Sequence, residues 1–348
     1  MSKTLNVGII GFGLSGRYFF SPFIENHRYM EIYAIVSSQV EEISQSYPKA
    51  KIYDNVSLLF SDPEIDLVVV ASPNDTHFEY AKKALQNGKH VIVEKPFSVS
   101  SAQASELIAL SNKMKLVLAP FHNRRWDGDF LTLQKIINEG KLGEIIEFES
   151  HFDRYRPLYE RVEWKSIPFK GNGILYDLGP HLIDQAICLF GKPKALFAHI
   201  TTHRKNSRTD DYFDIHLYYS LHKVILKAGV FVKETGPRFT LHGRNGSFVK
   251  YGLDPQENNL RHGMKPDNQL LGKDNEDLYA LLNYEVEGMS FREKIETIDG
   301  CYSQYFENVY NTIKNNEELA VSPNDAALVI QIIELACRSN SEKRIIEL

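Results

Sequence analysis

The chain has 348 residues, of which 43% are hydrophobic and 24% charged, and its formal net charge is −5. This length favours two domains, and the composition is that of a globular protein. The negative net charge argues against a nucleic acid partner, which would require a basic surface.

Cysteine usage and apolar runs indicate the cellular setting. The three cysteines, Cys188, Cys301 and Cys337, show no CxxC spacing, so we expect packing roles in a reducing compartment and no disulfide framework. A strand is predicted within about five residues of the first methionine, which leaves no room for a signal peptide. No apolar run approaches the roughly 18 residues that cross a bilayer. These features predict a cytoplasmic protein with no membrane partner.

Residues 1–121 predict alternating strands and helices. Residues 66–71 form a nearly continuous apolar run, which is typical of a central parallel strand covered on both faces. The alternation predicts a doubly wound parallel sheet, that is, a Rossmann domain that binds a dinucleotide. The predicted strands are 5–10, 31–36, 66–71, 90–93 and 115–119, and the predicted helices are 15–26, 75–87 and 101–112.

The pattern changes near Phe121, and residues 122–348 predict a second α/β domain. Period-two alternation in several long segments predicts an open antiparallel or mixed sheet. The polar stretch 256–283 predicts loops with a short helix. We expect this domain to bind substrate and to mediate oligomerisation. The predicted strands are 144–155, 195–203, 212–220, 223–232 and 238–242, and the predicted helices are 130–138, 173–190 and 324–339.

The strand at 212–220 carries large side chains on both faces. One face can pack on helices, whereas the other needs a partner or water. We therefore predict a homodimer or homotetramer. The first face carries Phe213, Ile215, Leu217 and Tyr219, and the second carries Tyr212, His216 and Tyr218.

A glycine motif, Gly11-x-Gly13-x-x-Gly16, follows the first strand and precedes a helix. Gly11 permits a tight turn, Gly13 lets the backbone approach a pyrophosphate, and Gly16 lets helix and strand pack closely. The helix N-terminus then faces the phosphates. A glycine-rich turn without a ligand is the alternative, but the flanking strand and helix favour a cofactor site. The residues expected to form it are Gly11, Phe12, Gly13, Leu14, Ser15 and Gly16.

The end of the second strand bears on the choice of nucleotide. NAD sites usually place an acidic residue there to accept the ribose 2′-hydroxyl, whereas this chain has Ser37-Ser38-Gln39. Ser37 and Ser38 can donate to a 2′-phosphate, no carboxylate in this segment repels one, and Arg17 can swing toward it to add positive charge. We therefore predict NADP as cofactor, with NAD possible if the serines are ordinary turn residues.

The segment after the central strand is expected to border the cofactor. Ser72, Pro73, Asn74 and His77 follow the central strand, although the Asp-Thr pair within this segment also suits a helix cap.

In Glu94-Lys95-Pro96, Lys95 ends the strand at 90–93, where such a fold binds its ligands. A surface lysine without a specific role is the alternative. We predict that Lys95 is catalytic and contacts substrate and cofactor, and that Glu94 orients it or contacts the ribose.

Asp177 and His181 lie four residues apart in a predicted helix, so they share one face. A carboxylate beside a histidine is the usual layout of an oriented general base. The alternatives are a structural pair, or Asp184 as the partner of His181. A zinc site would need more ligands than the spacing offers, so we predict no metal.

Two polar segments are candidates for ligand contacts. Asn123 and Trp126, within 122–127, are expected beside the nicotinamide, while Arg124 and Asp127 suit either a ligand or interdomain salt bridges. Arg154, Tyr155 and Arg156 end the first long strand of the second domain and line a polyol pocket or decorate an edge. We include Arg154 and Tyr155 among the substrate-binding residues.

Taken together, these motifs resemble the glucose–fructose oxidoreductase/inositol dehydrogenase/MocA family over the whole chain. The resemblance implies an N-terminal Rossmann domain and a C-terminal α/β domain with an open, mostly antiparallel sheet. It also implies a catalytic trio of Lys95, Asp177 and His181. Segments 122–127, 154–157 and 175–179 look most like the NADP-dependent scyllo-inositol dehydrogenase branch. That branch tends to carry arginine where this chain has Gln39.

The expected activity is hydride transfer between NADP(H) and a CH–OH or keto group of a cyclic polyol or sugar, with His181 as general base. Fold alone does not fix function. A cofactor-binding regulator without catalysis is one alternative. An imine or pyrrole reductase on the same scaffold is another, and it would not need the Asp–His pair.

Overall fold

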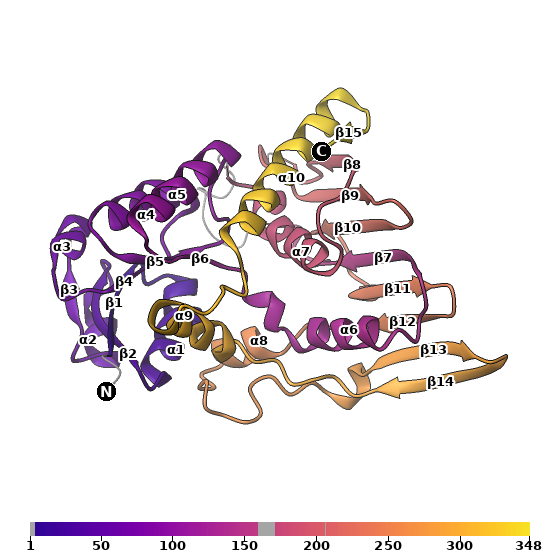
Figure 1. Cartoon of the computed structure of the whole chain (residues 1–348), viewed down its shortest axis with the longest axis horizontal. Coiled ribbons are helices and arrows are strands. Elements are labelled where there is room, and N and C mark those ends of the chain that lie inside the picture. The colour runs from indigo at the N-terminus through magenta and orange to yellow at the C-terminus, as the bar shows by residue number, and fades with distance from the viewer. Residues whose placement is uncertain (1–3, 159–170, 206) are drawn as a thin grey trace. The chain divides into compact units, whose positions relative to one another are not determined.

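The computed structural model describes residues 4–158, 171–205 and 207–348. Its contacts group the chain into two compact units (Figure 1). The first unit comprises Met1–Asn123, Gln256–Leu271 and Cys301–Ile330. The second comprises Arg124–Pro255, Gly272–Gly300 and Gln331–Leu348.

The first unit contains a six-stranded, fully parallel sheet with the strand order β3-β2-β1-β4-β5-β6. This is the order of a doubly wound dinucleotide-binding sheet, and it confirms the predicted fold class. Every residue of β4 is fully buried, as expected for a strand covered on both faces. The strands are β1 (Leu5–Ile10), β2 (Met30–Val36), β3 (Lys51–Tyr53), β4 (Leu67–Val70), β5 (His90–Glu94) and β6 (Leu118–Phe121).

Helices cover both faces of this sheet. A core rich in aliphatic side chains lies under α3, α4 and α5, while aromatic rings fill the side under α1 and α9. There the rings of Phe20 and Phe121 lie 4.3 Å apart, and Phe23 stacks on Phe306 at 5.3 Å. The predicted helix at 15–26 is a π-helical turn, η1 (Gly16–Phe20), followed by α1 (Ser21–Asn26). The other helices of the unit are α2 (Val40–Ser46), α3 (Val56–Ser61), η2 (Asn74–Thr76), α4 (His77–Gln86), α5 (Ser101–Met114), α8 (Gln256–Arg261) and α9 (Ser303–Asn315).

The second unit contains a nine-stranded mixed sheet with the order β14-β13-β12-β11-β7-β10-β9-β8-β15. Among its neighbouring strands only β7 and β10 run parallel. All five predicted strands are present; four of them are shorter than expected and the fifth, β11, is shifted by one residue. Four other strands were not predicted. The strands are β7 (Ile145–His151), β8 (Ala195–Thr201), β9 (Tyr212–Tyr218), β10 (Lys223–Gly229), β11 (Phe239–Gly243), β12 (Gly246–Lys250), β13 (Ala280–Val286), β14 (Met289–Ile295) and β15 (Ile346–Glu347).

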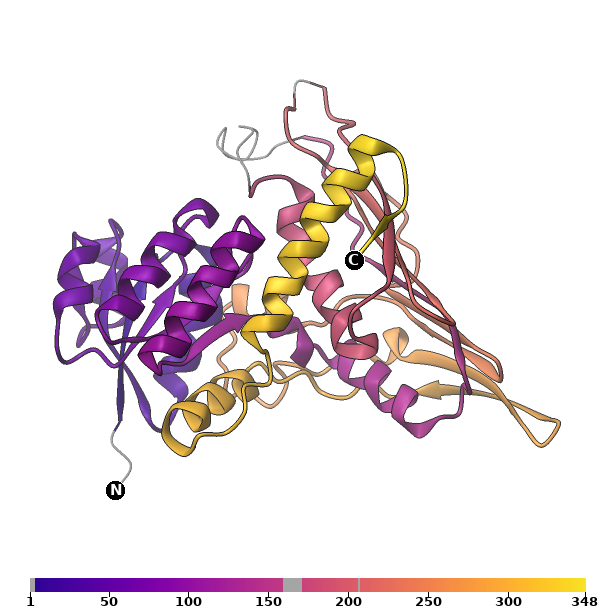
Figure 2. The same ribbon diagram turned by 45° about the horizontal axis from the view of Figure 1, so that its top comes forward.

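Helices lie on one face of this sheet (Figure 2). On β9 the alternation follows the prediction, because Phe213, Ile215 and Leu217 are fully buried while Tyr212 and Tyr218 on the opposite face are half-buried. The backbone amide of Ala198 donates to Ser339 Oγ at 3.1 Å, which ties α10 to β8. The helices are η3 (Asn123–Trp126), α6 (Gly128–Glu139), α7 (Ile174–Phe190), η5 (Glu276–Leu278) and α10 (Pro323–Glu342), whose first residues belong to the first unit.

Two absences hold for the described ranges. No helix there has both the length and the apolar character needed to cross a membrane. No three His, Cys, Asp or Glu side chains in those ranges gather closely enough to hold a metal ion.

Candidate active site

The glycine loop between β1 and η1 fits a dinucleotide pyrophosphate. Gly11 has φ +97°, and a Cβ there would lie 2.5 Å from the carbonyl oxygen of Ala71. A Cβ on Gly16 would lie 2.2 Å from the Gly11 oxygen, whereas one on Gly13 would meet no atom within 4 Å. Open space above Gly13, beside a helix start, is what a bound pyrophosphate requires.

The other loop residues divide into a buried and an exposed group. Phe12 is 2% exposed and packs edge-on against Tyr47. Leu14 is 47% exposed. Ser15 Oγ donates to Glu94 Oε1 at 3.2 Å, which links the loop to the end of β5.

The end of β2 holds a polar cluster that the sequence disclosed only in part. Ser37 Oγ accepts from the backbone amide of Gln39 at 3.2 Å, while Ser38 is exposed. Arg17 reaches this strand end, with Nη2 2.5 Å from Gln39 Oε1, so it needs no swing toward it. The same Nη2 lies 2.5 Å from Glu42 Oε2. The prediction that no carboxylate repels a 2′-phosphate was based on residues 37–39 alone. The structure adds a carboxylate to this strand end, that of Glu42 in α2.

His77 connects two strand ends. Its Nδ1 lies 2.8 Å from the Pro96 carbonyl oxygen and its Nε2 2.9 Å from that of Ser72. Burial lowers the pKa of His77 despite these carbonyl contacts. The imidazole is only 1% exposed, so it supports the loops after β4 and β5. Ser72 Oγ pairs with Thr76 Oγ1 at 2.6 Å, and Pro73 and Asn74 lie in the turn between them.

Glu94 and Lys95 lie at the carboxyl end of β5 in the first unit. Glu94 is 7% exposed and its carboxylate accepts from Ser15, as described above. Lys95 is partly buried and precedes Pro96. Burial, together with the charge of Glu94, raises the pKa of Tyr305 well above its usual range. The Tyr305 hydroxyl therefore stays protonated, and it donates to the Ala119 carbonyl at 3.3 Å.

In the second unit, α7 places Asp177 in its first turn and His181 one turn later. The Asp177 side chain is 48% exposed, and Arg154 Nη1 lies 3.9 Å from its Oδ2. His181 is 6% exposed. The helix thus presents an accessible carboxylate beside an arginine, followed by a shielded imidazole. Of the predicted substrate residues, Arg154 is brought to Asp177, whereas Tyr155 is 52% exposed and pairs with Phe231 in an isolated bridge.

The start of α7 is fixed by Asp210, which the sequence did not indicate. The backbone amide of Leu175 donates to Asp210 Oδ2 at 2.7 Å, and that of Ile174 donates to the Asp210 carbonyl at 3.0 Å. Gly173 allows this approach, since a Cβ there would lie 2.0 Å from Asp210 Oδ1. Asp210, in the segment before β9, therefore accepts from two backbone amides at the start of the helix that carries Asp177.

The segment around η3 holds α7 further along. Arg125 donates from Nε to Asp184 Oδ2 at 2.9 Å and from Nη2 to Oδ1 at 2.7 Å. Asp184, the alternative partner of His181 in the sequence, thus binds a guanidinium. Arg124 Nη1 lies 3.1 Å from Asp127 Oδ2, and both residues belong to the second unit. The predicted cofactor residues of this segment, Asn123 and Trp126, are 5% and 8% exposed.

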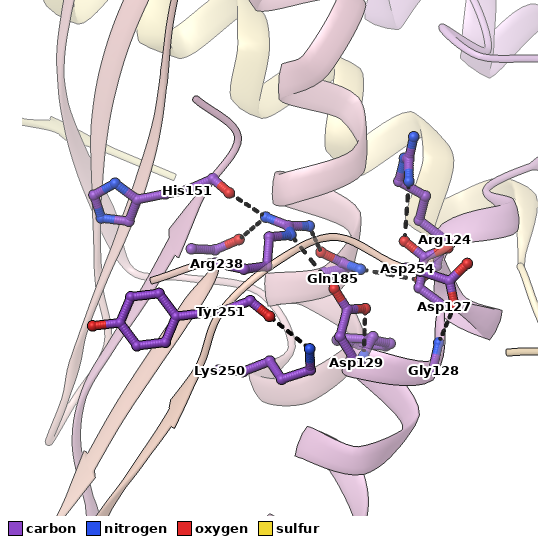
Figure 3. A network of polar contacts seen from close by, with 12 residues as sticks. Arg124, Asp127, Gly128, Asp129, His151, Gln185, Arg238, Lys250, Tyr251 and Asp254 are labelled. Atoms are coloured by element: carbon purple, nitrogen blue, oxygen red, sulfur yellow. Dashed lines mark hydrogen bonds and ion pairs between the residues drawn. The ribbon is translucent and has the colours of Figure 1, made fainter. Parts of the chain in front are cut away.

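A buried polar network under the sheet was not predicted (Figure 3). Arg238 donates to Ser150 Oγ and the His151 carbonyl at 2.8 Å, and to Gln185 Oε1 at 3.0 Å. Gln185 Nε2 in turn donates to the Arg124 carbonyl at 3.0 Å. Burial lowers the pKa of Arg238 to about 10, so it remains charged at neutral pH. The network joins β7, β11 and η3 to α7 four residues after His181.

Another buried cation, Lys250, lies on β12. Lys250 is fully buried, and its Nζ lies 2.8 Å from Asp274 Oδ2 and 2.6 Å from the Tyr251 carbonyl oxygen. Thr297 Oγ1 donates to the same Asp274 oxygen at 2.9 Å. These contacts tie the segment before β13 and the end of β14 to the sheet.

The chain is therefore a two-part α/β protein. Its first unit has the parallel sheet and glycine loop of a dinucleotide-binding domain, and its second unit has a mixed sheet. Residues 5–122 match the family model described as the oxidoreductase family, NAD-binding Rossmann fold, and residues 134–348 match its C-terminal alpha/beta domain. The chain belongs to this GFO_IDH_MocA oxidoreductase family, which confirms the resemblance inferred from its motifs.

Several relatives span nearly the whole chain. It is similar to scyllo-inositol 2-dehydrogenase (NADP(+)) IolW of Bacillus subtilis, at 37% identity over 99% of this chain and 96% of the relative. It is 41% identical to the uncharacterized oxidoreductase YdgJ of Escherichia coli, over 97% of each chain. The solved structure of the oxidoreductase YvaA from Bacillus subtilis superposes with a TM-score of 0.97 at 37% identity, covering 100% of this chain and 99% of that one.

Proposed function

We propose that this oxidoreductase transfers hydride between NADP(H) and a CH–OH or keto group of a cyclic polyol or sugar. The observation that carries the proposal is the polar end of α7, where Asp177 lies beside Arg154 and His181 follows one turn later. The similarity to an inositol dehydrogenase over almost the whole chain supports the same substrate class.

The proposed roles follow from the chemistry of each side chain. His181 accepts the proton of the substrate hydroxyl, and Asp177 orients the imidazole. Lys95 donates a hydrogen bond to the substrate oxygen and stabilises its developing negative charge. The nicotinamide ring, when bound, would accept the hydride from the substrate carbon that carries this hydroxyl. General acid–base catalysis of this kind contributes roughly 10²–10⁴-fold in rate.

The substrate class is supported by the donors around Asp177. Its exposed carboxylate can accept from sugar hydroxyls, and the Arg154 guanidinium can donate to them. Tyr155 offers an exposed ring and hydroxyl at the same strand end. Vicinal hydroxyls, which a polyol ring presents in a fixed arrangement, suit such paired donors and acceptors.

The preference for NADP(H) is supported by the cluster at the end of β2. Ser37 and Ser38 offer hydroxyl donors, and Arg17 places a positive charge at the same strand end. An arginine there accommodates a 2′-phosphate in doubly wound sheets. The glycine loop, Glu94, Asn74 and the segment at Asn123 remain the proposed contacts for the rest of the cofactor.

The test is a substrate screen with purified protein, in which oxidised NADP and NAD are offered with polyols and reduced NADPH and NADH with keto-sugars and cyclic imines, followed by absorbance at 340 nm. We expect turnover with inositols or related sugars, and faster turnover with NADP than with NAD. Nucleotide binding without turnover on any polyol or keto-sugar would favour a regulator. Reduction of cyclic imines that survives Asp177→Asn and His181→Ala would favour an imine reductase.

We further propose that the uncovered face of the nine-stranded sheet binds a second copy of this chain. That face carries aromatic side chains such as Tyr212 and Tyr218 together with both signs of charge, for example the Glu147–Lys223 pair at 2.7 Å. A surface with both signs of charge can complement its own copy across a two-fold axis. Light scattering at micromolar concentration should give a dimer or tetramer, and a monomer would refute this proposal.

A further inference from the structure

The side chain of Gln39 joins the glycine loop to the end of β2. Its Nε2 donates to the Phe12 carbonyl at 3.0 Å, which turns Oε1 toward Arg17 Nη2 at 2.5 Å. The Arg17 guanidinium also lies 5.6 Å from the centre of the Phe12 ring. Arg17 is therefore held over the strand end where a doubly wound sheet binds the adenosine ribose.

Glu42 competes for this guanidinium. It lies in the first turn of α2, and its Oε2 is 2.5 Å from the same Nη2 that contacts Gln39. The side chains of Arg17 and Glu42 are 33% and 43% exposed, so an incoming ligand can reach both. A 2′-phosphate would have to share Arg17 with the carboxylate, which would weaken its charge-assisted contact with the guanidinium, whereas an uncharged 2′-hydroxyl would lose little by this competition.

We propose that Glu42 is a specificity-determining residue that limits the preference for NADP(H) by holding Arg17. The inference rests on the proposed function in one respect, namely that the glycine loop binds a nicotinamide dinucleotide. It concerns selectivity between two nucleotides and not turnover, so binding measurements can test it without a substrate.

The experiment compares Glu42→Gln with Glu41→Gln. Glu41 lies in the same helical turn, is exposed, and undergoes the same change of charge. Dissociation constants for NADPH and NADH are measured by nucleotide fluorescence on the full chain, and thermal unfolding confirms that each variant is folded. A charge-assisted contact is about twice as strong as a neutral one. We therefore expect Glu42→Gln to raise the selectivity for NADPH over NADH by about five- to tenfold, and Glu41→Gln by less than about twofold.

A third variant tests whether the effect acts through Arg17. In the Arg17→Ala background, Glu42→Gln should leave the selectivity unchanged, because the guanidinium that it releases is absent. An equal shift in both glutamine variants, or a shift that persists without Arg17, would overturn the inference and point to long-range charge alone. Failure of the wild type to bind either nucleotide would overturn the proposed function together with this inference. Binding with unchanged selectivity in Glu42→Gln would overturn the inference alone.

Discussion

Replacing Arg125 with alanine should lower the free energy of unfolding of the second unit by about 3–5 kcal/mol. The Arg125 and Asp184 side chains are 9% and 2% exposed, and two hydrogen bonds of 2.9 and 2.7 Å join them. Removing one partner of such a pair leaves a buried carboxylate without its guanidinium, and the cost of that charge exceeds the value of the contact itself. Urea unfolding followed by far-UV circular dichroism measures the change.

A double-mutant cycle separates the interaction from the packing of the arginine. Arg125→Met and Asp184→Leu should each cost a similar amount, because each leaves the other charge buried and unbalanced. The two changes together should cost much less than the sum of these two single changes. Lys135→Ala is the control, since its pair with Glu139 is long and its side chain is 59% exposed. Surface pairs of this kind contribute about 0–1 kcal/mol.

The outcome that would refute this reasoning is equally definite. If Arg125→Ala changes the unfolding free energy by less than about 1 kcal/mol, or if the two single changes are additive, the pair does not anchor α7. A second reading comes from turnover, because His181 lies one turn before Asp184. Loss of the anchor should lower kcat while leaving NADPH binding by the first unit within about twofold.

Two further predictions concern catalysis and pH. Lys95→Ala and His181→Ala should each lower kcat at least about 10²-fold with NADPH binding retained, and Asp177→Asn should cost less because it only orients the base; turnover within about threefold of wild type would contradict these roles. Burial raises the pKa of Asp210 to about 6, so the native state holds the carboxyl proton more tightly than the unfolded chain does. As the pH rises from about 4 to 7, the free energy of unfolding of the wild type should therefore fall by up to about 3 kcal/mol relative to that of Asp210→Asn. Urea unfolding at several pH values checks this, and parallel stability profiles for the two proteins would exclude it.

The elements that could be predicted from sequence are those with a strong local pattern. The buried run at β4, the glycine loop after β1 and the alternation along β9 each identify their structure from a few neighbouring residues. The order of motifs along the chain then identified the family. These features sufficed to predict the parallel sheet of the first unit and the mixed sheet of the second unit.

The features that were missed depend on contacts between residues distant in sequence. Strand β14 is almost entirely exposed and rich in charged residues such as Glu293 and Lys294, so it lacks a buried alternation. Strand β12 ends in Lys250, a residue type expected at the surface, although its side chain is fully buried. The sequence of β12 therefore lacks the apolar pattern of a buried strand. Asp210 caps α7 from the segment before β9, and Glu42 reaches Arg17 from another helix. No spacing rule connects such residues, because the fold alone brings them together.

The buried pair of Lys250 and Asp274 has a consequence for how this family can diverge. A single change of Lys250 to an apolar residue leaves the Asp274 carboxylate buried, with Thr297 and the neighbouring backbone amide as its hydrogen-bond donors. A single change of Asp274 to an apolar residue leaves the Lys250 ammonium buried without its carboxylate. Either one-step intermediate is destabilised by several kcal/mol, on the order of 3–5, which is a large part of the stability of an average domain. Lineages should therefore keep both residues or exchange both, so that among homologues the identity of position 250 forecasts that of position 274.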